Sequence, residues 1–474
     1  MSIARRTPLF LALCLFTFNV QANGAASLDK HTVENAQQLA LASDKGTEAY
    51  AILESLTSEI GPRMAGSAAF DRAIVWAQEK FKSLGYDKVY LEPVTFPVWE
   101  RNRETAQVLA PFPQKLAITA LGGSVGTGTK PLDAEVVEFA TLDALKAAPA
   151  GSLTGKIAYI SNRMTRAKDG SGYGPAVVAR SGASDAAGKG AVALIIRSIG
   201  TDSDRFPHTG MQRYTEGAPR IPAAALSNPD ADLLSNILRR GQPVTVRLDI
   251  DSGLTGKSKT EYNVIGEIRG RSLPDEVVVI GGHLDSWDLG TGAVDDGAGV
   301  AITMAAGAMI GRLDKAPRRT IRVIAFANEE QGLWGGRAYA ETHKAELDKQ
   351  QLGAESDFGA GRIYAFRAGV APEARPVIEQ IGQLLAPLGI AYEATGGEPG
   401  PDISTFAKLG MPWGDLAQDG TDYFDLHHTA NDTLDKVDAK ALDQQVAAYA
   451  VMAYAAADSP VDFGRAPPIE EEKK

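Results

Sequence analysis

The chain has 474 residues, with 48 Lys and Arg against 59 Asp and Glu, and a formal net charge of −11 at pH 7. This length allows a large buried core and about two or three domains. An acidic chain without a basic block is poorly suited to binding nucleic acid or anionic membrane surfaces, so neither is expected as a partner.

The chain begins with residues that have the composition of a secretory signal peptide, residues 1–22. Arg5 and Arg6 form a basic start, residues 9–18 form an apolar stretch, and the sequence VQA is a small-residue cleavage site. The apolar stretch is about half of the ~20 residues that a membrane span requires, which argues against an uncleaved anchor. No later segment looks long and apolar enough to cross a bilayer. We expect cleavage near Ala22 and a periplasmic or secreted protein.

The only cysteine, Cys14, lies within this signal segment. The mature protein then has no disulfide and no thiolate metal ligand. Any bound metal ion must therefore be held by His, Asp and Glu side chains, and the chain has six histidines.

The N-terminal part of the mature chain, residues 23–108, is predicted to be two helices followed by a strand. Residues 29–60 have an amphipathic helical pattern that ends before a Gly-Pro pair. Residues 70–84 have apolar side chains at helical spacing, and Gly85 is a helix stop. Residues 88–98 alternate like a strand. We see no catalytic cluster in this part.

The composition of the sequence changes over residues 109–255, where glycine and alanine are frequent and the predicted elements are short. Strands are predicted over residues 156–160, 191–196, 221–226 and 244–248, and a helix over 176–190. We interpret this stretch as a separate module inserted into the main domain. It has no carboxylate–histidine cluster, and its only histidine, His208, is interpreted as a solvated loop residue.

Strands and helices alternate over residues 256–460. This alternation predicts an α/β fold with a mixed or parallel sheet and helices on both faces. The end of the chain, residues 461–474, is predicted to be a polar and disordered tail.

One loop in this region carries an unusual density of ionisable groups. The apolar residues 277–280 suit a buried strand, and two glycines follow. Behind them come five ionisable residues, His283, Asp285, Asp288, Asp295 and Asp296. A small-residue helical run, AGVAITMAAGAMIG, comes next. In open α/β sheets ligands bind at the carboxyl ends of strands, so we interpret this loop as half of a metal site.

Three further clusters follow along the chain. The strand-like TIRVIAF ends in Glu329 and Glu330, of which one can bind a metal ion while the other acts as a general base. For this pair alone, a solvated acidic turn is the alternative interpretation. The short run LGAESD ends at Asp357, and it is weak evidence by itself.

The last cluster, DLHHTANDT, brings His427 and His428 together between acidic residues. One of the two histidines is a plausible ligand. Asp432 or Thr433 is interpreted as a cap for a long helix over residues 439–457. Together the clusters offer the His, Asp and Glu ligands that two divalent ions sharing one carboxylate would need, and zinc accepts both nitrogen and oxygen ligands.

At this point the sequence resembles the co-catalytic di-zinc exopeptidases, the leucyl aminopeptidase and glutamate carboxypeptidase family, and within it the carboxypeptidase Q group. The motifs that carry the resemblance are IGPRMAGS at 60–67, GGHLDSWDLGTGAVDDGAG at 281–299, FANEEQGLWG at 326–335, ESD at 355–357 and DYFDLHHTANDT at 422–433. The resemblance covers nearly the whole mature chain. It implies a mixed-sheet zinc exopeptidase domain with an inserted protease-associated domain at 109–255.

The resemblance also implies a role for each site residue. Two zinc ions would be held by His283, Asp295, Glu330, Asp357 and His428. Asp295 would bridge both ions, and Glu329 would be the general base that acts on a metal-activated water. Asp285 would orient His283 from outside the ligand set. A cis peptide is implied between Asp295 and Asp296, which makes Asp296 a backbone neighbour and not a ligand.

The implied activity is hydrolysis of small peptides with a free N-terminus, as an aminopeptidase or dipeptidase of the carboxypeptidase Q type, with a homodimer as a possible assembly. Two alternatives remain: a single-zinc enzyme similar to glutaminyl cyclases, and a non-catalytic, receptor-like binding protein. Amino- against carboxypeptidase preference stays open. The run PDISTF at 401–406 and Tyr423 are candidates to line the substrate pocket.

Overall fold

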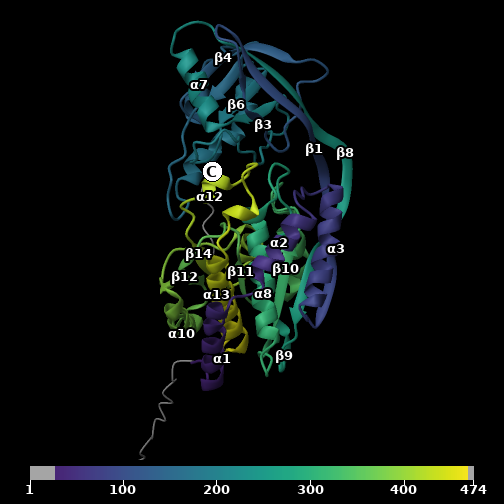
Figure 1. The fold of residues 1–474 in the computed structure, drawn as a ribbon, viewed down its shortest axis with the longest axis vertical. Helices are drawn as coiled ribbons and strands as arrows, with labels where there is room; N and C mark the ends of the chain where they lie inside the picture. The colour runs from purple at the N-terminus through teal and green to yellow at the C-terminus, as the bar shows by residue number, and fades with distance from the viewer. Residues whose placement is uncertain (1–26, 468–474) are drawn as a thin grey trace, which may run out of the picture.

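The computed structural model of the chain describes residues 27–467 (Figure 1). The predicted signal segment and the last residues of the predicted tail lie outside the described residues. Figure 1 shows two lobes stacked along the long axis. The lower one, the main lobe, contains residues 27–98 and 255–467, and the upper one, the inserted module, contains residues 99–254.

The main lobe is built on a mixed sheet with the strand order β13-β12-β14-β11-β9-β10-β8. The bounds of these strands are β8 Thr245–Ile268, β9 Leu273–His283, β10 Arg319–Phe326, β11 Gln350–Glu355, β12 Ile363–Gly369, β13 Ala391–Tyr392 and β14 Trp413–Gln418. Strands β10, β9, β11 and β14 are parallel to one another. Strand β8 is antiparallel to β10 on one side, and β12 is antiparallel to β14 on the other. The predicted mixed sheet is confirmed. The carboxyl ends of β9, β10 and β11 consequently lie at one edge.

Helices cover both faces of this sheet, as predicted. Strand β9 shows why, because its side chains alternate between two cores. Val278 and Ile280 pack in the core formed with α8 (Ala298–Gly311) and α13 (Ala439–Asp458). Val277 and Val279 pack in a second core with α9 (Trp334–His343) and α11 (Pro401–Ala407). The other helices of this lobe after residue 255 are α10 Arg375–Leu385 and α12 Tyr423–Leu426, with short 3-10 turns at Lys344–Lys349, Pro372–Ala374, Ala386–Leu388 and Leu434–Lys436.

Helix α8 is apolar on every side and fills the centre of the main lobe. The segment Ala293–Gly311 is long and apolar enough to cross a membrane by length and composition, so the expectation that no such segment follows the signal is wrong. It is 94% buried inside the protein, as expected for the central helix of a core. Among the described residues it is the only segment that passes this test.

The N-terminal helices pack on the same face as α8. The predicted helix over 29–60 is broken into α1 (Lys30–Ala40), a 3-10 turn (Leu41–Lys45) and α2 (Ala49–Glu59). Gly46 adopts a left-handed φ of 79° at the break, which only glycine takes without strain. Helix α3 (Ala68–Ser83) begins at Ser67, whose side chain accepts the Phe70 N–H.

A long two-stranded ribbon joins the lobes. Strand β1 (Lys88–Ala110) continues beyond the predicted end at residue 98 and pairs antiparallel with β8 along almost its whole length. Figure 1 shows the two strands running side by side past the junction. Pro97 faces Ser258 across the ribbon, close to where the main lobe gives way to the module.

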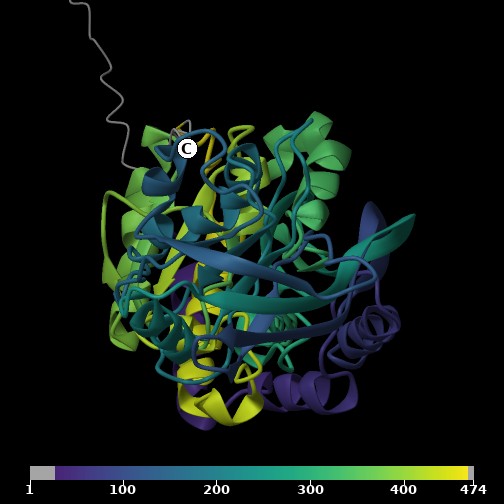
Figure 2. The ribbon, with the colours of Figure 1, turned by 90° about the horizontal axis from the view of Figure 1, so that it is seen from above.

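The inserted module has its own small sheet, β4-β5-β6-β7-β3, which continues from β8. Its elements are β2 Gln114–Leu116, β3 Ile118–Ala120, β4 Leu132–Phe139, α4 Leu142–Lys146, β5 Ile157–Ile160, α5 Tyr173–Val177, a 3-10 turn Val178–Ser181, α6 Gly182–Gly188, β6 Ala193–Arg197, β7 Ala223–Leu226 and α7 Asn228–Leu238. Two apolar cores lie on the faces of this sheet. Trp99 already belongs to the first of them, so the module's packing begins before the predicted boundary at 109. Figure 2 looks down on this module where it covers the main lobe.

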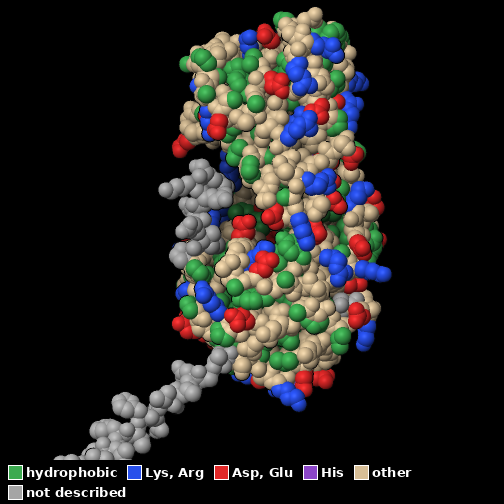
Figure 3. Space-filling model, turned by 90° about the vertical axis from the view of Figure 1, so that its left-hand side faces the viewer, with side chains coloured by type: hydrophobic (Ala, Val, Ile, Leu, Met, Phe, Trp, Pro, Cys, Tyr) green, Lys and Arg blue, Asp and Glu red, His purple; other side chains and the backbone are tan. Residues whose placement is uncertain are grey.

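The surface of the protein carries charges of both signs. On the face in Figure 3, acidic and basic side chains of the described residues are interspersed over both lobes.

Phe463 is fully buried and its N–H donates to Gln351 Oε1. The first residues of the predicted polar tail therefore pack against the main lobe.

Candidate metal centre

His283 is the last residue of β9 and is buried at the carboxyl edge of the sheet. Its backbone N–H donates to Asp296 Oδ2 at 2.9 Å. Its ring Nδ1 lies 3.0 Å from the carbonyl oxygen of Asp285, which requires the proton to be on Nδ1. The lone pair of Nε2 is then free to bind a cation, and Nε2 points at the carboxylate of Asp295, 3.0 Å from Oδ1.

Asp295 lies between two histidines. Its second oxygen, Oδ2, is 3.2 Å from His428 Nε2, is buried and has no hydrogen-bond donor among the described residues. Burial alone would raise the pKa of Asp295, but the contacts with His283 and His428 hold it well below its usual range. Asp295 follows Gly292, which adopts a left-handed φ of 60°. One carboxylate thus faces two imidazoles from opposite oxygens.

The peptide bond between Asp295 and Asp296 is cis, as expected. The Asp296 carboxylate accepts the N–H of His283 with one oxygen and the N–H of Gly299 at 3.1 Å with the other. Burial, and after it the charge of Asp357, raises the pKa of Asp296 well above its usual range. Asp296 therefore ties the end of β9 to the start of α8.

Glu330 contacts the same ring nitrogen of His428 as Asp295 does. Its Oε2 lies 2.9 Å from His428 Nε2, and its buried Oε1 has no partner among the described residues. Burial, and to a lesser degree the nearby Asp295, raises the pKa of Glu330 to about 7. Burial would lower the pKa of His428, but Glu330 and Asp295 raise it to about 9.

Asp357 approaches the same group from the end of β11, with Oδ1 3.6 Å from His283 Nε2. The ligand atoms of His283, Asp295 and Glu330 lie within 4.8 Å of one another, and so do those of His283, Asp296 and Asp357. Buried carboxylate oxygens without donors, beside imidazole nitrogens, are what a bound cation would satisfy. The donor set therefore fits one or more divalent metal ions.

Glu329 sits beside this cluster without joining it. It is partly buried, and its carboxylate makes no hydrogen bond or ion pair with the described residues. Burial, and then the neighbouring carboxylates of Asp357 and Glu330, raise its pKa well above the usual range, although His283 acts in the opposite direction. A carboxylate with raised proton affinity next to a cation site is suited to accept and return a proton.

Asp285 holds the turn that carries the two glutamates. Its Oδ1 accepts the Glu329 N–H at 3.0 Å, and Oδ2 faces the Glu330 N–H at 3.4 Å. Its carboxylate is 3.6 Å from His283 Nδ1, farther than its own backbone carbonyl. Asp285 thus orients His283 mainly through its carbonyl, and its carboxylate positions Glu329 and Glu330.

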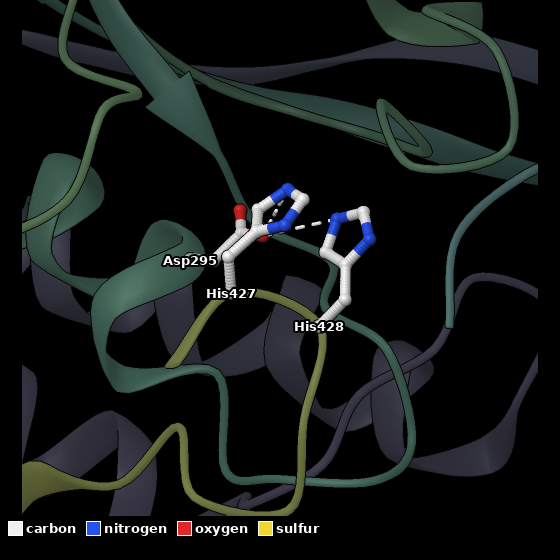
Figure 4. A group of neighbouring side chains, drawn as sticks. All are labelled: Asp295, His427 and His428. Atoms are coloured by element: carbon white, nitrogen blue, oxygen red, sulfur yellow. Dashed lines mark ion pairs between the residues drawn. The ribbon is translucent and has the colours of Figure 1, made fainter. Parts of the chain in front are cut away.

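Both adjacent histidines approach Asp295 (Figure 4). Their rings are stacked with centroids 3.5 Å apart, and His427 Nε2 lies 3.7 Å from Asp295 Oδ2, against 3.2 Å for His428. Only His428 also contacts Glu330. Two acids of the predicted clusters lie outside the group, since Asp288 pairs with Arg101 and Asp425 with Arg166.

Asp432 was predicted to cap the last helix, and that prediction is wrong. The cap of α13 is Asp438, whose side chain accepts the Lys440 N–H. Asp432 accepts instead the N–H of Val294 at 2.6 Å and of Asp295 at 3.2 Å. Its position four residues after His428 was the only signal in the sequence.

Arg63, in the motif IGPRMAGS, is a functional residue that the sequence did not single out. It is fully buried, and its guanidinium donates to the carbonyl oxygens of Leu284, Thr291 and Gly292 at 2.5, 2.7 and 2.9 Å. The three acceptors lie near the two ends of the loop between His283 and Asp295. An N-terminal segment therefore fixes the shape of the loop that carries His283 and Asp295.

His208 was predicted to be a solvated loop residue, and this is wrong. Its side chain is fully buried, with Nε2 2.7 Å from Asp202 Oδ1 and Nδ1 2.7 Å from the carbonyl oxygen of His427. Of the two remaining histidines, His31 is exposed, and His343 is partly buried and paired with Glu92.

An open α/β sheet that gathers buried imidazoles and carboxylates at its carboxyl edge, with a separate raised-pKa carboxylate beside them, defines a metal-dependent hydrolase. Comparison with known proteins narrows this class. The model of peptidase family M28 matches residues 263–453. Carboxypeptidase Q of Mus musculus is 36% identical over 410 residues, which cover 86% of this chain and 85% of that protein. The chain belongs to peptidase family M28, and it is a zinc-dependent exopeptidase.

One solved structure agrees with the family, and a second one shares the fold. The crystal structure of a peptidase M28 precursor from Shewanella amazonensis SB2B is 52% identical and superimposes with a TM-score of 0.90, covering 93% of this chain and 99% of that one. A zinc aminopeptidase from Bacillus subtilis, 20% identical, shares the fold with a TM-score of 0.62 over 88% of this chain and 98% of its own.

Proposed function

We propose that this protein is an exported di-zinc exopeptidase that hydrolyses small peptides with a free N-terminus. The observation that carries the proposal is Asp295, whose two oxygens face His283 and His428 separately. Asp295 would help to hold both ions, and the remaining donors would divide between them. His283 and Asp357 would complete one site, and Glu330 and His428 the other.

Two zinc ions held there would lower the pKa of a water molecule and polarise the scissile carbonyl. Glu329 then removes a proton from the attacking water and returns it to the leaving amine nitrogen. Asp285 keeps Glu329 in place through the Glu329 N–H, and Asp432 keeps Asp295 in place through the Asp295 N–H. The buried surroundings strengthen each of these interactions.

Zinc removal and counting test the metal assignment. A chelator is expected to abolish turnover, because the buried carboxylates lose the cations that make them functional, and added zinc is expected to restore it. Metal analysis of the restored enzyme is expected to give two zinc ions per chain. One zinc ion per chain with full activity would contradict the di-zinc proposal and favour the single-zinc alternative that resembles glutaminyl cyclases.

A substrate panel tests the activity. We expect free dipeptides to be hydrolysed in the presence of zinc and the same dipeptides with a blocked N-terminus to resist hydrolysis. Longer peptides with a free N-terminus show whether length is limited, and C-terminally amidated dipeptides show whether the carboxylate is recognised. Equal rates on blocked and free dipeptides would refute the requirement for a free N-terminus.

Three further assignments belong to this proposal. Residues 1–22 are a signal peptide that is cleaved near Ala22, which would place the enzyme in the periplasm or outside the cell. The inserted module is a protease-associated domain. A homodimer is a possible assembly, and sedimentation of the mature enzyme would establish its oligomeric state.

A further inference from the structure

The inserted module contacts the loop that carries His428 at successive points along it. At its start, the Gly420 N–H donates to the carbonyl oxygen of Lys168 at 2.9 Å. Further on, Arg166 pairs with Asp422 and Asp425 at 2.6 Å. The loop therefore runs under the module and is bonded to it well before the histidines. Figure 1 shows α12, which lies in this loop, at the junction of the lobes.

The contacts continue at the two histidines. His208 Nδ1 lies 2.7 Å from the carbonyl oxygen of His427, and Asp202 holds the other ring nitrogen of His208. The next module residue, Thr209, donates its N–H to the carbonyl oxygen of His428 at 3.0 Å. The same Thr209 accepts, through its own carbonyl oxygen, from His428 Nδ1 at 3.3 Å.

These bonds fix two features of His428, its backbone conformation and the position of its ring proton. Its φ of 63° is in the left-handed region, which a residue with a side chain keeps only where its surroundings hold it. A carbonyl oxygen can only accept, so the bond to Thr209 requires the proton of the neutral ring to be on Nδ1. The lone pair is then on Nε2, the nitrogen that faces Asp295 and Glu330.

The acceptor itself is fixed from within the module. Arg180, which is buried, donates from Nη2 to the carbonyl oxygen of Thr209 at 2.7 Å and from Nη1 to the hydroxyl of Tyr173 at 2.9 Å. The Thr209 hydroxyl donates to the carbonyl oxygen of Ala120 at 2.9 Å. Thr209 is therefore a rigid support whose position depends on the fold of the module.

We propose that His208 and Thr209 of the inserted module are positioning residues for the metal ligand His428, so that the module completes the metal centre. His208 holds the backbone at residue 427, and Thr209 holds the backbone and the ring of His428. The inference rests on the proposed role of His428 as a zinc ligand. If both roles hold, the affinity for the zinc ion bound by His428 depends on residues more than 200 positions earlier in the chain.

The test measures zinc affinity with the full mature enzyme in metal-buffered solutions. His208→Ala is expected to raise the dissociation constant of the weaker-bound zinc ion by about 10–100-fold, the usual effect of removing a partner that orients a ligand. The other zinc ion is expected to bind as before, and kcat is expected to recover at saturating zinc. His208→Asn keeps a donor toward the His427 carbonyl, so its effect is expected to be smaller.

Tyr159→Phe is the matched control. It removes a buried hydrogen bond within the module, from the Tyr159 hydroxyl to the carbonyl oxygen of Ala231, which involves neither His208 nor Thr209. Its zinc affinity is expected to equal that of the unmodified enzyme. A loss of zinc by Tyr159→Phe as large as that by His208→Ala would show a general effect of module stability and overturn the proposal.

The variant His428→Ala distinguishes the ligand role of His428 from the positioning role of His208. If it loses one zinc ion while His208→Ala and His208→Asn bind two zinc ions with unchanged affinity, the support role is wrong and the ligand role stands. If His428→Ala itself binds both zinc ions normally, the ligand role fails and the positioning role fails with it. A selective loss in His428→Ala and a graded weakening from His208→Asn to His208→Ala would support both.

Discussion

Replacing Glu329 with Gln is expected to lower kcat by about 10²–10⁴-fold, the range found when a general base is removed. Gln has nearly the same shape but cannot take a proton from the attacking water. Since the Glu329 carboxylate makes no hydrogen bond or ion pair with the proposed ligands, the variant is expected to keep its full zinc content. The backbone bond from the Glu329 N–H to Asp285 is unaffected, so the turn stays in place.

The measurement is steady-state kinetics on a dipeptide together with metal analysis. Glu341→Gln on α9 is the matched control, because Glu341 is an exposed glutamate whose ion-pair partner is Lys344 on the surface. Its kcat is expected to stay within twofold of the unmodified value, a margin typical of a distant surface change. A Glu329→Gln enzyme that turns over at the unmodified rate with full zinc would show that another group is the base.

Arg63→Met is expected to lower the free energy of unfolding by about 3–5 kcal/mol and to abolish turnover. The carbonyl oxygens of Leu284, Thr291 and Gly292 lose their guanidinium donor, and each unsatisfied buried group costs about 1–3 kcal/mol. The buried carboxylate of Asp432 also loses a nearby positive charge. Methionine fills much of the space, so the loss comes chiefly from polar groups and not from a cavity.

Urea denaturation measures the change in stability, and zinc content shows whether the loop still binds metal. Arg63→Lys keeps the charge but cannot reproduce the three-pronged bonding, and an intermediate loss is expected. Arg72→Met on α3 is the control, since Arg72 is exposed and donates to the carbonyl oxygen of Ala68 in its own helix. A stability of Arg63→Met within 1 kcal/mol of the unmodified protein, roughly the scatter of single mutants, would contradict a clamping role.

Much of the proposed site was predictable because its residues follow apolar strands. His283 directly ends β9, and Glu329, Glu330 and Asp357 lie just beyond the ends of β10 and β11. Parallel strands end at one edge of a sheet, so local patterns were enough to place these residues together. The mixed sheet, the helices on both faces and the small-residue helix after Asp296 followed from the same periodicities.

The supporting residues were not predictable, because their roles depend on partners remote in the chain. Arg63 and the loop it holds are 221–229 positions apart, and His208 and His427 are 219 apart. The local sequence around His208 is polar and glycine-rich, as in a solvated loop. Asp432 shows the same limit, since an Asp before a helix is an ordinary cap and only the folded chain turns it toward Asp295.

The ribbon formed by β1 and β8 bears on how such a two-lobed enzyme could arise. Pro97 and Ser258 are register partners on adjacent antiparallel strands, so the chain leaves and re-enters the main lobe at points about 5 Å apart. A short hairpin turn could close that gap, which means that a whole domain can be acquired there without disturbing the ancestral sheet. Once Thr209 supports His428, however, losing the domain again would cost the enzyme a metal-site contact.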